Sequence, residues 1–378
     1  MRTQLDALPA SHPALLEYYR YLEGYGALTL RTEPAGAPIT LHRYKRQGLR
    51  LVSAAVKELG VTPLEGVHIA PGSYLLVVES AGGPVRVPIA LERLETFEFV
   101  GPDGDERLLR LPDDGALAED DVFVPFGWSW VGGDPNAIGS GPRRRAWHDA
   151  LVVKRFPVTN HEYKAFLDDL VVQGRQEEAL RHVPRVRAGT VGQQGAMIYG
   201  RAEDGSFVLR PDADGDAWDP GQAVVCVTWH GAMAYARWRG EREGLPWRLL
   251  TADEWEAVGR GADARVFPWG DHFDPAFCCM RDSHEGRPHI QEVDSYPLDE
   301  SPYGVRGLAG NVRDWCADEV ADGRMVDRGG FWLGNAREAR LADQHEHVPE
   351  HRASEVGFRI ARSWDGSRPA KDSRCDER

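Results

Sequence analysis

The run QHEHVPEH, residues 344–351, concentrates side chains that can bind a metal ion. It places His345, His347 and His351 among two glutamates. Imidazole nitrogens and carboxylate oxygens bind zinc and non-haem iron, so one interpretation is a metal site for oxidase or oxygenase chemistry. The other interpretation is a polar, solvated or ligand-facing loop before the last strand. The residues alone leave both interpretations open.

The surrounding segment, Phe331 to Arg352, has the composition of a binding face. Gly329 and Gly330 before it suit tight backbone packing, and Phe358 after it suits the core. The side chains between them are too polar to be buried as a block, and a loop held at both ends is partly preorganised for binding. The residues expected to contact a ligand are Trp332, Asn335, Glu338, Asp343, His345, His347 and His351.

The five cysteines do not form an obvious ligand set or disulfide framework. Their number is odd and they are scattered, unlike the cysteines of a small secreted domain. Adjacent cysteines such as Cys278 and Cys279 rarely bind one ion together, because their side chains diverge. We therefore expect structural thiols there, and we expect Cys316 to pack in the core beside Trp315.

The composition describes an acidic, globular chain. Of its 378 residues, 42% are hydrophobic, which can fill a sizeable core, and the formal net charge is −14. This charge argues against binding to nucleic acids or to anionic membranes. We find no apolar run that suits a signal peptide or a membrane span, so we expect a cytoplasmic protein without membrane contact.

Apolar residues at helical spacing predict the helices that frame this chemistry. Thr159 or Asn160 caps one helix, and Thr251 with Glu254 forms a capping box at the start of another. The predicted helices cover residues 10–24, 158–174, 228–244 and 251–261. Long Gly- and Trp-rich connections separate the later ones, and such loops usually carry function in a compact domain.

Alternation of apolar and polar residues predicts a small antiparallel β-module near the N-terminus. Hairpins are expected around a Pro-Ala-Gly turn at 34–36 and an Ala-Gly-Gly-Pro turn at 81–84. An Asp-, Gly- and Pro-rich stretch then predicts a linker. The expected organisation is an N-terminal helix within 1–24, the β-module at 25–100, the linker at 101–121, a large domain at 122–364 and a tail at 365–378.

Six motifs of the large domain resemble those of the formylglycine-generating enzyme family, also called sulfatase-modifying factors. They are FPVTNHEYKAF, VVCVTWHGAMAYARW, LPWRLLTADEWEAVGRG, FPWGD, SPYGVRGLAGNVRDWCAD and a final RGG-W to GFR segment. The resemblance covers residues 122–364 and implies a loop-rich α+β fold, a compact variant of the C-type lectin fold. CCMRDSHEGRP looks most like such domains behind bacterial serine/threonine kinases. TPLEGVHIAPGSYLLVVES in the N-terminal module resembles the PEGA-like β-domain of those proteins.

The resemblance also implies where cofactors would bind. The family's oxidases hold copper with two cysteines, which fall at Gly334 and Ala339 in this chain, and neither position has sulfur. Copper and formylglycine formation are therefore not expected. Structural calcium is common in the family near the GNVRDW motif, which implies Asn311 and Asp314 as ligands. The alternative for Asn311 is a side chain that pins its loop by bonding backbone groups.

These features together predict a catalytically silent relative that binds a ligand. The expected partner is an unknown protein or small molecule, and a serine/threonine kinase in bacterial signalling is one candidate. A related interpretation is the displayed variable protein of a diversity-generating retroelement. The alternative from another class is a metal-dependent oxidase or oxygenase that uses His345, His347 and His351.

Overall fold

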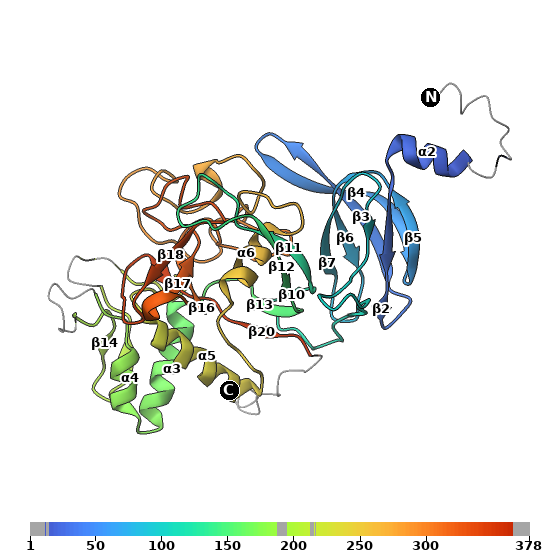
Figure 1. The fold of residues 1–378 in the computed structure, drawn as a ribbon. Helices are drawn as coiled ribbons and strands as arrows, with labels where there is room; N and C mark the ends of the chain where they lie inside the picture. Colours follow the sequence, from blue (N-terminus) through green and yellow to red (C-terminus); the bar gives the residue numbers. More distant parts are fainter. Residues whose placement is uncertain (1–11, 13–14, 187–194, 212–214, 216, 366–378) are drawn as a thin grey trace.

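The computed structural model describes residues 12, 15–186, 195–211, 215 and 217–365. A β-rich N-terminal module lies at one side of the molecule, and a larger C-terminal domain lies at the other (Figure 1). The helices are α2 (Leu15–Glu23), α3 (Asn160–Val172), α4 (Gln176–His182), α5 (Trp229–Glu243), α6 (Ala252–Arg260), η1 (Pro275–Phe277) and η2 (Ala321–Gly323). Within the described ranges, none of these helices has the length and apolar character needed to cross a bilayer.

The strands of the N-terminal module form small, mainly antiparallel sheets. Their orders are β4-β3-β6-β7, β5-β1-β8 and β2-β9. The strands are β1 (Gly26–Leu30), β2 (Thr32–Glu33), β3 (Pro38–Gln47), β4 (Arg50–Val61), β5 (Leu64–Ile69), β6 (Gly72–Val78), β7 (Val85–Leu91), β8 (Thr96–Phe97) and β9 (Leu109–Arg110). Leu41, Leu76 and Val87 lie opposite one another on β3, β6 and β7, and all three are buried. Side chains on one face of the sheet therefore build the core of this module.

One expected hairpin is confirmed and the other is wrong. β6 and β7 pair antiparallel across the Ala-Gly-Gly-Pro turn, with Val78 opposite Val85. The chain around the Pro-Ala-Gly turn does not form a hairpin, because β1 pairs with β5 and β8 whereas β3 pairs with β4 and β6. Alternation of residue types predicted the strands, but pairings between distant segments decide their partners.

The second half of the linker predicted at 101–121 is part of the folded structure. Leu109 and Leu111 are buried, and β9 pairs in parallel with β2 of the N-terminal module. The next strand, β10, already begins at Asp121. The Asp- and Gly-rich composition therefore marks surface turns, and the predicted linker is packed against its neighbours from Leu109 onward.

The two parts of the chain are docked against each other. The β3–β4 hairpin extends from the module toward the loops of the large domain (Figure 1). The amide of Leu51 donates a hydrogen bond of 2.7 Å to the carbonyl of Trp269. The guanidinium of Arg265 lies over the ring of Tyr44, 4.6 Å from its centroid. Backbone and side-chain contacts thus both join the hairpin to the large domain.

The helices of the large domain begin where the sequence predicts. Thr159 with Glu162 and Thr251 with Glu254 form complete capping boxes at α3 and α6. Helix α4 was not predicted, and it begins without a side-chain cap hydrogen bond, so its start carries no such signal. At the N-terminus α2 covers part of the predicted helix. The first residues of that prediction and most of the expected tail lie outside the described residues.

Short strands organise the large domain around α6. Their sheet orders are β18-β17-β16-β19, β10-β13-β20, β11-β12 and β14-β15. The strands are β10 (Asp121–Val124), β11 (Gly127–Val131), β12 (Arg144–His148), β13 (Leu151–Lys154), β14 (Gly200–Arg201), β15 (Phe207–Val208), β16 (Arg313–Glu319), β17 (Met325–Arg328), β18 (Gln344–His347), β19 (Val356–Gly357) and β20 (Ala361–Ser363). Trp255 of α6 packs in one buried cluster with Cys316 of β16 and Val326 of β17. This packing fixes β17, while β18 lies at the edge of its sheet.

Candidate functional site

Strands β17 and β18 bring one acidic residue and two histidines together. The strands pair antiparallel, with Asp327 opposite His345 and Met325 opposite His347. Residues directly opposite share a face of the sheet, and side chains along a strand alternate between faces. Asp327, His345 and His347 therefore lie on the same face. A loop was one interpretation of the histidine run. Its first part, Gln344–His347, is instead a strand.

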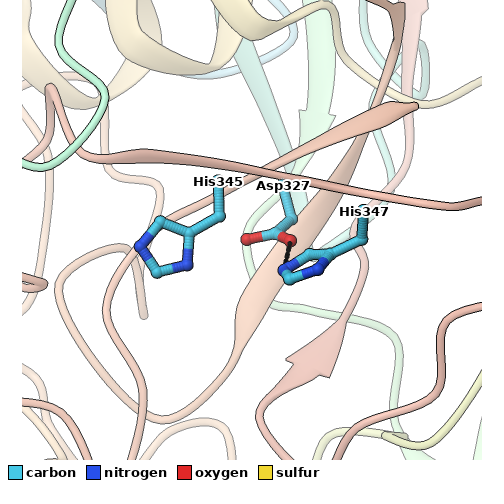
Figure 2. Close-up of side chains that lie close together, drawn as sticks. All are labelled: Asp327, His345 and His347. Atoms are coloured by element: carbon cyan, nitrogen blue, oxygen red, sulfur yellow. Dashed lines mark ion pairs between the residues drawn. The ribbon is translucent and has the colours of Figure 1, made fainter. Parts of the chain in front are cut away.

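The carboxylate of Asp327 lies between the two imidazole rings (Figure 2). Nε2 of His347 lies 3.1 Å from Oδ2 of Asp327. One potential ligand atom from each of Asp327, His345 and His347 lies within 4.8 Å of the other two. The Asp327 side chain is fully buried, whereas those of His345 and His347 are 29% and 28% exposed. The cluster is therefore closed on the carboxylate side and open to solvent on the histidine side.

A buried arginine of β16 fixes the acidic side of the cluster. Nε of Arg313 donates to Oδ1 of Asp327, and Nη1 of Arg313 donates to Oδ1 of Asp343 over 2.8 Å. Oδ2 of Asp343 accepts from the amide of Ile138 at 3.1 Å. Arg313, Asp327 and Asp343 are all buried. A shift of any of the three would leave a buried charge unpaired, so this network holds a single geometry.

The pKa values of the cluster follow from burial and from Arg313. Burial raises the pKa of Asp343 to about 6, although Arg313 opposes this shift. Burial lowers the pKa of His345 to about 4, and the Arg313 charge adds to the lowering. Burial also opposes ionisation of Asp327, but Arg313 and His347 outweigh it and hold this pKa below its ordinary range. At neutral pH Asp327 is therefore a carboxylate and His345 a neutral imidazole.

The third histidine of the run packs on the second. The ring of His351 stacks on that of His347, with centroids 4.1 Å apart and planes inclined by 7°. The buried ring of Trp315 stands nearly perpendicular to both imidazoles. His351 is not one of the three residues whose ligand atoms converge. The three histidines predicted as one group thus divide into two that face Asp327 and one that supports His347.

Two residues expected to contact a ligand are part of the supporting structure. Asp343 is fully buried in its pairing with Arg313, so the prediction of a contact residue is wrong there. Trp332 is partly buried against the core, and its indole N–H donates to the carbonyl of Ser354 over 2.9 Å. Composition could not distinguish these side chains from exposed ones, because a polar residue in a loop can also be buried with a partner.

Asn335 and Glu338 form a turn at the surface. The amide of Asn335 donates to the Glu338 carboxylate over 2.8 Å, and the Asn335 side-chain oxygen accepts from the amide of Arg337 over 2.9 Å. Asn335 is exposed and Glu338 is partly exposed, so both can reach a ligand. Arg340 pairs with Asp134 at 2.6 Å and joins this turn to a distant loop.

The positions that correspond to the copper-binding thiols are closely packed. Gly334 and Ala339 are both buried. A Cβ atom at Gly334 would lie 3.0 Å from the carbonyl oxygen of Phe331 and 3.3 Å from its ring. Neither position offers sulfur, and the first has little room for a larger side chain. Copper held by a thiolate pair therefore does not fit these residues.

The cysteines elsewhere in the described residues do not replace the missing pair. Cys226, Cys278, Cys279 and Cys316 are all buried and free. Burial raises the pKa of Cys226 and of Cys279 to about 12. Thiols in this state are poor nucleophiles and poor metal ligands, which fits the expected structural role. Cys375 lies outside the described residues.

The two residues implied as calcium ligands bond to protein groups. The side-chain oxygen of Asn311 accepts from the amide of Gln291 over 3.1 Å, and its NH2 group donates to the Gln291 carbonyl over 3.0 Å. The carboxylate of Asp314 accepts from Trp255 and from Arg359. Asn311 thus pins its loop to a neighbouring backbone, as its alternative interpretation predicted. Both bonds of Asp314 are made by Oδ2, whereas its Oδ1 is buried without a hydrogen-bond partner, so calcium at this pair stays a prediction.

Arg313 and Asp327 are site residues that the sequence patterns did not predict. Asp327 follows two apolar residues in the short strand MVDR, directly before the RGG motif. A charged residue at an inward position of a buried strand signals a buried partner, and this signal could have drawn attention to it. Asp327 lies beside His345 because of the β17–β18 register, and no local pattern in the sequence predicts that register.

The larger domain is similar to proteins of one family. The family described as "Sulfatase-modifying factor enzyme 1-like domain" matches residues 111–364. "Inactive C-alpha-formylglycine-generating enzyme 2" of Bos taurus is 27% identical over 64% of this chain and 87% of that protein. "Formylglycine-generating enzyme" of Thermomonospora curvata is 26% identical over 65% of this chain and 94% of that protein. Relatives thus include a protein named as an enzyme and one named as inactive.

Two further comparisons extend this likeness. "Serine/threonine-protein kinase pkn1" of Chlamydia caviae is 28% identical over 64% of this chain, a match that spans 37% of the kinase. The solved structure of PvdO from Pseudomonas aeruginosa superimposes with a TM-score of 0.52 at 21% identity, covering 65% of this chain and 96% of PvdO. The structural likeness shows the fold of the large domain alone.

Proposed function

We propose that this chain, which belongs to the sulfatase-modifying factor enzyme 1-like family, is a catalytically silent member that binds a protein or a small-molecule ligand. The observation that carries the proposal is the absence of sulfur at Gly334 and Ala339. Formylglycine formation by the family's route needs thiolates that hold copper, and the described cysteines are buried elsewhere. The relative from Bos taurus that is named inactive supports the same proposal.

The proposed binding face is the outer surface of β18 and the turn after it, residues 344–352. Glu346, Val348 and Glu350 are exposed there, and Val348 retains 53% of its surface. An apolar side chain between two carboxylates suits a partner with an apolar centre and a basic rim. The Arg313 network beneath holds the strand in one geometry, which lowers the entropic cost of binding.

The architecture supports a recognition role. We propose that the large domain is a compact variant of the C-type lectin fold and that the N-terminal module is PEGA-like. A rigid core of this kind presents long loops whose sequence can change without unfolding the domain. The similarity to a chlamydial serine/threonine kinase makes a signalling kinase one candidate partner.

A peptide oxidation assay tests the silent part of the proposal. Protein loaded with copper would be incubated with oxygen and a cysteine-containing sulfatase peptide, and the peptide mass would be followed. We expect no mass loss that corresponds to aldehyde formation. A clear aldehyde product would contradict the proposal.

Surface variants test the binding part. Glu346→Lys combined with Val348→Asp reverses charge and polarity on the proposed face without touching a buried group. Val172→Asp is the matched control, because Val172 is 85% exposed at the end of α3. In pull-downs from the native host, we expect the double variant to lose partners that the wild type and the control retain, with unchanged melting temperatures. Equal capture by all three proteins would exclude this face.

A further inference from the structure

We infer that Asp327, His345 and His347 bind a single divalent first-row transition metal ion. This site differs in position and in donor atoms from the thiol pair of the family. The inference is independent of the proposed binding function, because it depends only on the geometry of β17 and β18. The residues come from adjacent strands and share one face of the sheet.

The distances suit donors around one ion. Metal–ligand bonds to imidazole and carboxylate are about 2.0–2.2 Å long, so two donors on the same ion lie about 3 Å apart. Oδ2 of Asp327 and Nε2 of His347 are 3.1 Å apart. The largest separation within the set is within 4.8 Å, and both imidazoles project from an edge strand with one side open. A rotation of the His345 ring can therefore complete the site without movement of the backbone.

The unbonded oxygen of Asp327 is the second observation that points to a ligand. Oδ2 is buried and lies on the His347 side of the carboxylate, 3.1 Å from Nε2 of that ring, but it accepts no hydrogen bond of acceptable geometry. Leaving a buried carboxylate oxygen unsatisfied is costly, and a cation placed between the rings would remove that cost. The other oxygen is fixed by Arg313, so Oδ2 remains directed at His347.

Outer groups orient the donors and set the charge. Nε2 of His345 lies 3.6 Å from Oδ1 of Asp343, a carboxylate behind a histidine as in many metal sites. Asp327 and Asp343 carry two negative charges, and Arg313 supplies one positive charge. The two carboxylates thus outnumber the one guanidinium, and this excess of negative charge attracts a cation.

The donor set selects the class of metal. Two imidazole nitrogens and one carboxylate oxygen suit zinc, iron(II), cobalt(II), nickel(II) or copper(II), whereas calcium and magnesium prefer oxygen ligands throughout. Three protein ligands leave at least one position on the ion for water or another ligand. The partial exposure of His345 and His347 gives such a ligand access from solvent.

Metal titration of the full chain tests the inference. Protein freed of metal with a chelator would be titrated with zinc by calorimetry and with cobalt(II) by visible absorption. We expect one ion per chain and cobalt bands typical of nitrogen and oxygen ligands. His345→Gln and His347→Gln should each weaken binding at least about tenfold, since even residues that only orient a ligand contribute about 10- to 100-fold.

Two control variants define the ligand set. His351→Phe keeps the stack on His347 but removes both nitrogens, and we expect unchanged affinity. His289→Gln alters a second histidine pair, in which the rings of His284 and His289 are 5.1 Å apart, and it should also leave affinity unchanged.

The inference is overturned if zinc and cobalt do not bind, or if His345→Gln and His347→Gln bind as well as the wild type. In the first case, a proton shared between Asp327 and His347 would account for their contact. Both histidines are partly exposed, so these variants should fold, and their metal-free melting temperatures check this. The peptide oxidation assay can fail or succeed independently, so the two proposals are tested separately.

Discussion

The two halves of the segment between the RGG and GFR motifs differ in the potential metal ligands that they carry. The first half, residues 331–343, lacks the sulfur atoms of the family's oxidases and packs Gly334 and Ala339 against the core. The second half, residues 344–352, presents His345 and His347 beside a buried carboxylate. One segment of the fold thus carries small, packed residues in its first half and potential metal ligands in its second half. The fold alone therefore does not state the chemistry of this segment.

The largest expected effect comes from Arg313, which joins Asp343 of the first half to Asp327 beneath the second half. Arg313→Met would leave the carboxylates of Asp327 and Asp343 buried without their cation. Breaking a buried ion pair from one side costs about 3–5 kcal/mol, so we expect a loss of this size in the free energy of unfolding. Urea denaturation followed by tryptophan fluorescence measures it. Arg337→Met, at an exposed arginine of the first half, is the control and should change stability by less than about 0.5 kcal/mol.

Zinc should stabilise residues 344–347 of the second half and leave hydrogen exchange in the first half, residues 331–343, nearly unchanged. At a free concentration of about 100 times Kd, a ligand of the native state adds about 2.7 kcal/mol to stability. We expect a higher melting temperature with zinc, together with slower hydrogen exchange in residues 344–347. Equal slowing in residues 331–343 would show that the two halves respond as one unit.

Restoring the thiol pair should cost stability without restoring the chemistry. A side chain at Gly334 meets the carbonyl oxygen and ring of Phe331 at close range, and Ala339 is fully buried. Overpacking of this kind costs about 1–3 kcal/mol, so we expect Gly334→Cys with Ala339→Cys to unfold at lower urea concentration. Tight copper(I) binding by a fully stable double variant would show instead that only the sulfur atoms were missing.

The smallest effect is expected at Asn335. Its side chain accepts one hydrogen bond from the Arg337 amide at the surface. Asn335→Ala should therefore lower stability by about 1 kcal/mol or less and leave zinc affinity unchanged. Calorimetry of the variant with and without zinc checks both values. A change in affinity would show that the first half contributes to the metal site.

Local signals and distant pairings explain which predictions succeeded. A capping box such as Thr251 with Glu254 involves only four consecutive residues, so the helix starts could be predicted from local sequence. The likeness of motifs predicted the family fold of the large domain, which the comparisons show. The histidine run was identified as a candidate metal site, but its partner Asp327 lies 18 residues earlier and meets it only through strand pairing. For the same reason the hairpin expected at 34–36 was wrong, because β1 and β3 pair with other strands.

The docked β3–β4 hairpin also fixes the position of the N-terminal module on the large domain. Leu51 and Tyr44 connect the hairpin to Trp269 and Arg265, so the N-terminal module does not swing freely on its connection. β4 is an edge strand with a largely exposed surface, and β18 is the edge strand of the other part. A molecule held at one edge and a molecule held at the other would keep a constant separation and orientation. The contacts of the hairpin therefore fix the separation and the orientation of these two edge strands.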